Sequence, residues 1–135
     1  MNLLNALLKT IKSLLFFIFD SIALFFSRHP KQNKKDLVLL IRQDAIGDFI
    51  IWLDTAKEFK TLYPSKKYKI ILVGNSMWCS LAELLPYWDE VIPVDIKKFK
   101  TLNSYRWKLL KKIRFLGAKI AIQPTFSREF YNGDS

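Results

Sequence analysis

The residues best suited to chemistry lie between Arg42 and Asp48, in the segment RQDAIGD. Asp48 is either a carboxylate that caps a helix or a general base that takes a proton from an acceptor hydroxyl; the spacing alone favours the cap. Arg42 is either an exposed cation at a strand end or a clamp for a phosphate or carboxylate group. Gly47 allows a tight turn and a close approach of a ligand to the backbone. We expect Asp44 to be a loop residue that accepts hydrogen bonds from backbone amides.

The composition excludes several other kinds of site. Cys79 is the only cysteine and His29 the only histidine, so an internal disulfide and Cys- or His-cluster metal cages are excluded. A single histidine also argues against a Ser-His-Asp triad. The chain contains neither a G-x-G-x-x-G dinucleotide motif nor a P-loop. We therefore expect no metal and no resident cofactor.

Elements that alternate along the chain must position these residues. Short apolar runs predict strands, and apolar residues at helical spacing predict helices between those strands. The resulting order β-α-β-α-β-α-β predicts an α/β fold with a Rossmann-like parallel sheet. The predicted strands are residues 37–41, 68–73, 90–94 and 119–122, and the predicted helices are 49–63, 76–85 and 102–116. Parallel sheets bind ligands beyond the carboxyl ends of their strands. That rule selects residues 42–48, 74–76, 95 and 123–128.

An amphipathic helix is predicted before this domain. Residues 1–28 form the helix, residues 29–36 a basic linker, and residues 37–135 a partial Rossmann-like domain. A signal peptide fits poorly, and Asp20 would make full membrane insertion costly. Two interpretations remain: a helix that lies in an anionic membrane interface, which we favour, or a helix packed on its own domain or on a partner. The predicted membrane contacts are Lys9, Lys12, Phe16, Phe17, Phe25, Phe26 and Arg28.

The charge of the chain indicates an anionic partner. Lys and Arg number 22 against 12 Asp and Glu, a net charge of +10. Nucleic acid, anionic lipid and a phosphorylated substrate all fit this balance. Nine cations lie between Lys97 and Lys119 with no acid among them. They are either a solvated helix face, which we favour, or a surface for membrane or lipopolysaccharide phosphates; no nucleic-acid-binding motif surrounds them, and we expect no nucleic-acid partner.

Three segments resemble glycosyltransferase family 9, the ADP-heptose:lipopolysaccharide heptosyltransferases. The first is LVLLIRQDAIGDFIIWLDTAKEFKTLYP, residues 37–64; the others are residues 82–95 and 121–128. The resemblance implies a GT-B architecture of two Rossmann-like domains, with the acceptor held by the N-terminal one. It implies that Asp48 is the general base of a metal-free, inverting transfer. Thr125, Ser127 and Arg128 would lie at the cleft edge, where Arg128 is either a partner for an acceptor phosphate or an exposed loop cation.

The resemblance also sets expectations for the whole reaction. A heptose-like sugar would pass from a nucleotide sugar to a lipopolysaccharide core, at the cytoplasmic face of the bacterial inner membrane. The donor would bind a second domain, which is absent from these 135 residues, so we expect this chain alone to be inactive. The alternative is a non-catalytic, membrane-tethered binding module or a truncated gene product.

Overall fold

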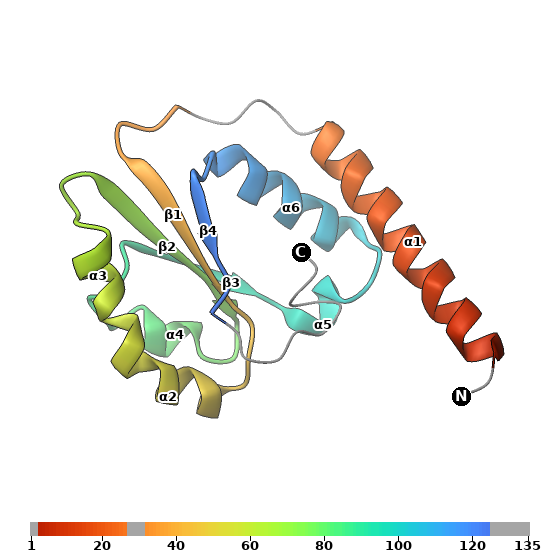
Figure 1. Cartoon of the computed structure of the whole chain (residues 1–135), viewed down its shortest axis with the longest axis horizontal. Coiled ribbons are helices and arrows are strands. Elements are labelled where there is room, and N and C mark those ends of the chain that lie inside the picture. The colour runs from red at the N-terminus through yellow and green to blue at the C-terminus, as the bar shows by residue number, and fades with distance from the viewer. Residues whose placement is uncertain (1–2, 27–31, 125–135) are drawn as a thin grey trace.

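Four parallel strands form the centre of the molecule. The computed structural model describes residues 3–26 and 32–124, and within them the strands are ordered β3-β2-β1-β4 (Figure 1). The strands are β1 (Asp36–Arg42), β2 (Tyr68–Asn75), β3 (Glu90–Val94) and β4 (Ile120–Ile122). All three strand pairs are parallel. The predicted α/β, Rossmann-like fold class is therefore confirmed.

Helices cover both faces of this sheet because β1 is apolar on both sides. Val38 and Leu40 pack into one core cluster, whereas Leu37 and Leu39 pack into another. The first cluster also receives α2 (Ile46–Ala56), α3 (Glu58–Leu62) and α4 (Cys79–Ala82), and the second receives α5 (Ile96–Phe99) and α6 (Ser104–Leu116). Strands buried on both faces do not show alternating polar and apolar residues. The continuous apolar run of residues 37–41 therefore predicted this strand correctly.

Several helices differ from the predicted ones. Helix α5 was not predicted, and α6 begins at Ser104 and not at residue 102. The helix expected over 49–63 is two helices, α2 and α3, and α2 begins earlier, at Ile46. The helix expected over 76–85 is reduced to the four residues of α4, because the carbonyl and side chain of Asn75 hold the preceding residues in a turn. The end of α6 agrees with prediction: Gly117 is its C-cap, with a φ of 65°.

Trp78 occupies the space beyond the carboxyl end of β2. Its ring is fully buried and stacks on Phe49, with the ring centroids 3.9 Å apart. A Cβ on Gly74 would lie 2.3 Å from the ring atom Cη2 of Trp78. Gly74 is therefore required by the close packing of this indole. Trp52, Trp88 and Cys79 are buried in the same cluster.

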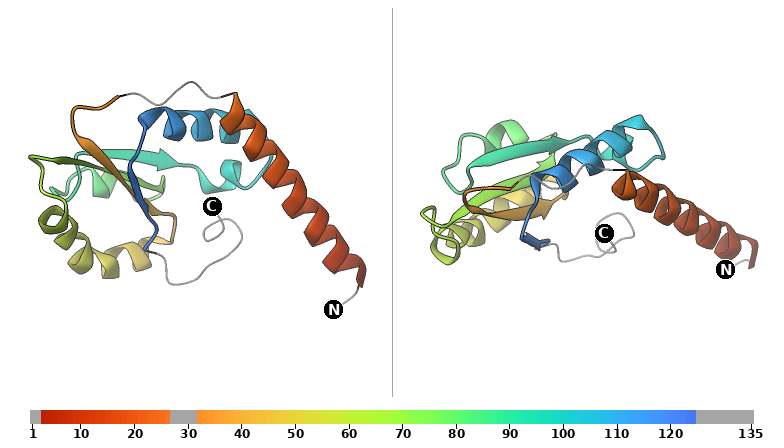
Figure 2. Two further views of the ribbon diagram at one scale, coloured as in Figure 1. Left: turned by 45° about the horizontal axis from the view of Figure 1, so that its top comes forward. Right: turned by 90° about the horizontal axis from the view of Figure 1, so that it is seen from above.

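Helix α1 (Leu3–Phe25) packs against α6 through its C-terminal half (Figure 2). The guanidinium of Arg106 donates through Nε to Asp20 Oδ1 at 2.7 Å and through Nη1 to the carbonyl of Phe99 at 2.8 Å. It also lies between the rings of Phe16 and Phe99, 4.7 and 4.3 Å from their centroids. Asp20 thus joins α1 to the domain through a buried cation.

These contacts correct two predictions. Phe16, expected at the membrane, is buried, with 3% of its surface exposed. Arg106, expected on a solvated helix face, is 6% exposed. Phe17, Phe25 and Phe26 remain exposed. No helix in the described ranges is both long enough and apolar enough to cross a membrane.

The close contact at Gly74 can be tested with a pair of glycine substitutions. Gly74→Ala should lower the free energy of unfolding by about 1–3 kcal/mol, because the Trp78 ring cannot move out of its stack. A Cβ on Gly47 meets nothing within 4 Å, so Gly47→Ala should instead stabilise helix α2 by about 0.5–1 kcal/mol. Urea denaturation measures both. Equal effects of the two substitutions would contradict the packing described for Trp78.

The attachment of α1 can be tested at Asp20. Asp20→Ala leaves the Arg106 guanidinium without its carboxylate, and should reduce stability by about 1.5–3 kcal/mol. Hydrogen exchange should accelerate in residues 16–25. Asp54→Ala is the control, because the Asp54 side chain is 96% exposed and pairs with Lys57 at 3.5 Å. Unchanged exchange in α1 of the Asp20 variant would show that other contacts hold the helix.

Candidate functional site

The candidate site lies at the carboxyl edge of the sheet, where Arg42 ends β1. The Arg42 guanidinium donates to the backbone carbonyl of Pro124, beyond β4, and to that of Asp48 at 3.3 Å. It forms an ion pair with Asp44 at 2.9 Å and lies 5.0 Å from the centroid of the Trp52 ring. Arg42 is 7% exposed. The prediction of an exposed cation is therefore wrong. The protein itself engages both terminal nitrogens, Nη1 and Nη2, of the guanidinium that was expected to clamp a ligand.

Asp44 is held on both its side chain and its backbone. Its carboxylate pairs with Arg42, and its carbonyl accepts hydrogen bonds from Trp78 Nε1 at 2.8 Å and Asn75 Nδ2 at 3.4 Å. Burial raises the pKa of the Asp44 carboxyl, Arg42 opposes that shift, and the nearby charge of Asp48 adds to it. The side chain thus pairs with a buried cation, in contrast to the predicted role of accepting from backbone amides.

Asp48 lies exposed in the first turn of α2. The N-cap of this helix is Ala45, and no side chain caps it, so the capping interpretation of Asp48 is wrong. Among the described residues, no hydrogen bond or ion pair engages the Asp48 carboxylate. The first turn of a helix favours a negative charge. A carboxylate in this position is available to a substrate.

Gly47 is part of the same turn. It lies within α2 and does not have a positive φ, so the predicted tight turn is not what this glycine provides. The space that a Cβ would occupy is open. The absence of a side chain therefore leaves open space beside the Asp48 backbone, and the close approach of a ligand there stays a prediction.

The other strand ends contribute less to an open site. Trp78 fills the space over Gly74 at the end of β2. Asp95, after β3, caps α5 by accepting from the backbone N–H of Lys98 at 3.1 Å. Beyond β4, the backbone of Pro124 is held by Arg42. The predicted substrate contacts Thr125, Ser127 and Arg128 lie outside the described residues, as does the predicted membrane contact Arg28.

Sequence analysis selected residues 74–76 as a segment at the binding edge but assigned no role to Asn75, although this residue organises the site. Asn75 is 9% exposed, donates to the carbonyls of Gln43 and Asp44, and accepts from the backbone N–H of Met77 at 3.1 Å. A polar residue at the end of β2, after the apolar residues 70–73 and Gly74, was the signal in the sequence that could have identified it. Asn75 fixes the loop that precedes Asp48.

Three buried polar atoms lie around this loop without a partner among the described residues. They are Arg42 Nε, Gln43 Oε1 and Trp52 Nε1. Two N–H donors and one acceptor oxygen suit a water molecule or a polar group of a ligand. The described residues contain no cluster of three or more metal-binding side chains. The polar chemistry at this edge is therefore that of carboxylates, amides and a guanidinium.

Comparison with known proteins assigns no family to the chain. No family model, no curated protein and no solved structure matches it. The resemblance to glycosyltransferase family 9 therefore stays a prediction from the three segments named above.

The role of Arg42 can be tested through the pH dependence of stability. Arg42→Gln leaves a buried Asp44 carboxylate without its cation, and should cost about 3–5 kcal/mol at pH 7. Without Arg42 the folded-state pKa of Asp44 rises further, so the folded protein binds this proton more tightly than the unfolded chain does. The loss of stability should therefore shrink as pH falls through the raised pKa of Asp44, because the carboxyl then becomes neutral.

Urea denaturation of the wild type and the variant between pH 4 and pH 7 measures this effect. The double variant Arg42→Gln, Asp44→Asn is the control, because it carries no carboxylate to be left unpaired. Its stability should vary less with pH than that of Arg42→Gln. A loss that is constant across this range would contradict the ion pair as the main contribution of Arg42.

Proposed function

We propose that this chain is the acceptor-side part of a GT-B glycosyltransferase, with Asp48 as the general base. The observation that carries the proposal is the exposed Asp48 carboxylate, which no described residue engages, at the carboxyl edge of a parallel sheet. Ligands of parallel α/β sheets bind at this edge. The open space beside Gly47 lets an acceptor approach the same turn.

The reaction assigns a separate task to each carboxylate. Asp48 accepts the proton of an acceptor hydroxyl while that oxygen attacks the anomeric carbon of a nucleotide sugar. The new C–O bond forms as the bond to the nucleotide diphosphate breaks, with inversion at the anomeric carbon. Asp44 takes no part in proton transfer, because it pairs with Arg42 at 2.9 Å. Arg42 is a positioning residue that holds the Asp48 carbonyl.

The resemblance to glycosyltransferase family 9 supports the substrate class. The donor is a nucleotide sugar of the heptose type, bound by a second domain. The acceptor is a lipopolysaccharide core or a related glycan, at the cytoplasmic face of the bacterial inner membrane. Three apolar side chains of α2, those of Ile46, Ile50 and Ile51, are 48%, 50% and 79% exposed. Exposed apolar residues next to Asp48 suit contact with a second protein domain.

A non-catalytic, membrane-tethered binding module is the second candidate. The observation that favours it is the exposed apolar side of α1, where Leu3 is 88% and Phe25 is 83% exposed. Such a module would use the sheet domain for binding alone. The Asp48 carboxylate would then be dispensable for its function.

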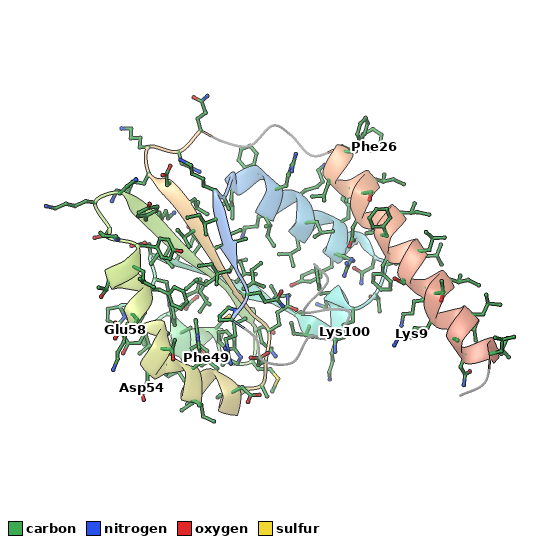
Figure 3. The ribbon with its side chains drawn as sticks, in the orientation of Figure 1. Lys9, Phe26, Phe49, Asp54, Glu58 and Lys100 are labelled. Atoms are coloured by element: carbon green, nitrogen blue, oxygen red, sulfur yellow. The ribbon has the colours of Figure 1, made fainter. Side chains whose placement is uncertain are left out.

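Asp48→Asn separates the two candidates. In a protein that includes the donor-binding side, this substitution should lower kcat for transfer from ADP-heptose by about 10²–10⁴-fold, because the base is lost. The melting temperature should change only slightly, since no side chain in the described chain pairs with Asp48 and only its favourable position in the first turn of α2 is affected. Asp54→Asn is the matched control on the solvent side of the same helix (Figure 3), and should retain activity. Full activity of Asp48→Asn would overturn the assignment of the base.

Acceptor binding can be measured on this chain directly. A lipopolysaccharide core oligosaccharide should shift the backbone amide resonances of residues 42–48, and Asp48→Asn should leave that binding within a few-fold of the wild type. The absence of any shift would contradict the acceptor-side assignment. Sugar transfer by the 135-residue chain alone would contradict the need for a separate donor side.

A further inference from the structure

The outward side of α1 is a continuous apolar stripe. Leu7, Leu14, Ile18 and Phe25 are separated by seven, four and seven residues, a spacing that places them on one side of a helix. They are 56%, 57%, 45% and 83% exposed. An exposed apolar surface of this length marks a docking site.

The opposite side of α1 is already used by the protein. Phe16 and Ala23, the two residues of α1 that are buried, face the domain together with Asp20. Lys9 also projects from the side of the helix nearer the domain (Figure 3). The polar side of the helix therefore points inward. The Asp20 charge, which would oppose contact with lipid, is neutralised by Arg106.

The first half of α1 has little support from its own domain. No residue between Leu3 and Leu15 is buried, and this part of α1 extends away from the sheet (Figure 2). Isolated helices of about 12–15 residues are marginally stable in water. The helix is thus expected to gain stability from whatever covers its apolar side.

The charge of the surrounding surface indicates which partner covers the apolar stripe of α1. Helices α1 and α6 lie side by side and carry seven cations against one carboxylate, that of Asp20, for a net charge of +6. The cations are Lys9, Lys12, Arg106, Lys108, Lys111, Lys112 and Arg114. Arg106 is buried against Asp20, so the accessible charge of this pair of helices comes mainly from four cations of α6: Lys108, Lys111, Lys112 and Arg114. A second copy of the chain would bring the same cations to the interface and be repelled, whereas an anionic bilayer complements the charge.

The solvent side of α6 supplies a second contact. Lys108, Lys111, Lys112 and Phe115 follow one face of the helix and line an open recess of about 290 Å³. Phe115 is 43% exposed between these ammonium groups. Ammonium groups around an aromatic ring suit the phosphates and upper acyl chains of a lipid surface.

We propose that α1 and α6 form one face that docks on an anionic lipid bilayer, with the outward stripe of α1 in the interface and the α6 lysines on headgroup phosphates. The Asp20–Arg106 pair sets the orientation of the sheet domain on that surface. The inference rests on the membrane location in the proposed function and is independent of catalysis. A failure of membrane binding and a failure of transferase activity are thus separate results.

Vesicle flotation of the full chain tests the inference. The probes are vesicles of phosphatidylcholine alone and of phosphatidylcholine with phosphatidylglycerol at three to one. The chain should float with the anionic vesicles, and less so as salt is raised. Leu14→Asp, at an exposed position of the stripe, should weaken partitioning by about tenfold or more.

A matched pair of triple variants isolates the contribution of α6. Replacing Lys108, Lys111 and Lys112 by Gln should lower the partition coefficient by about fivefold per lysine, or about a hundredfold in total. Replacing the exposed Lys57, Lys66 and Lys67 by Gln removes the same charge elsewhere, and should have a much smaller effect. Circular dichroism melts verify that each variant folds.

Three results would overturn the proposal. Equal effects of the two triple variants would remove α6 from the docking face. Flotation of Leu14→Asp at the wild-type level would remove the stripe of α1. A stable dimer in light scattering without vesicles, lost in Leu14→Asp, would identify a second copy of the chain as the occupant of the stripe.

Discussion

The burial of guanidinium groups is the constraint on which this structure most depends. A buried charge is costly unless hydrogen bonds and a counter-ion compensate it. Arg42 and Arg106 are 7% and 6% exposed. Each has as partners one carboxylate, one or more backbone carbonyls and at least one aromatic ring. Arg42 joins β1 to α2 and to the chain beyond β4, and Arg106 joins α6 to α1 and α5. The carboxyl edge of the sheet is thus organised around Arg42, and the junction of α1 with the domain around Arg106.

The requirement of the buried Arg42 guanidinium for a counter-ion explains why two nearby aspartates have different roles. Asp44 is within reach of the guanidinium and becomes its counter-ion, and its pKa rises because the same site is buried. Asp48, one turn further along, contributes only its carbonyl to Arg42 and keeps an exposed carboxylate. A group that transfers protons must reach its substrate. Asp48 meets that requirement and Asp44 does not, although both belong to the same short segment.

Sequence patterns predicted the sheet well because strand formation here depends on local composition. Residues 37–41 and 70–73 are apolar throughout, and the structure places them in neighbouring parallel strands. The burial of Arg42 was not predictable in this way. Its partners include Pro124, which lies 82 residues away, and a Trp52 ring that reaches it only after α2 has packed. Gly74 was assigned to a ligand site for a similar reason, since no local pattern reveals that Trp78 returns to cover it.

Helix α1 shows how far an amphipathic pattern can guide interpretation. The pattern correctly predicted a helix with one polar side, but a helical wheel does not state which side faces the protein. Asp20 was an argument against membrane insertion, yet in the folded chain it is paired with Arg106, 86 residues away. Because that pair draws the polar side inward, the apolar side is left outward, as Leu14 and Phe25 show. The residue that opposed a membrane helix in the sequence is therefore the one that, in the fold, turns the helix toward an apolar partner.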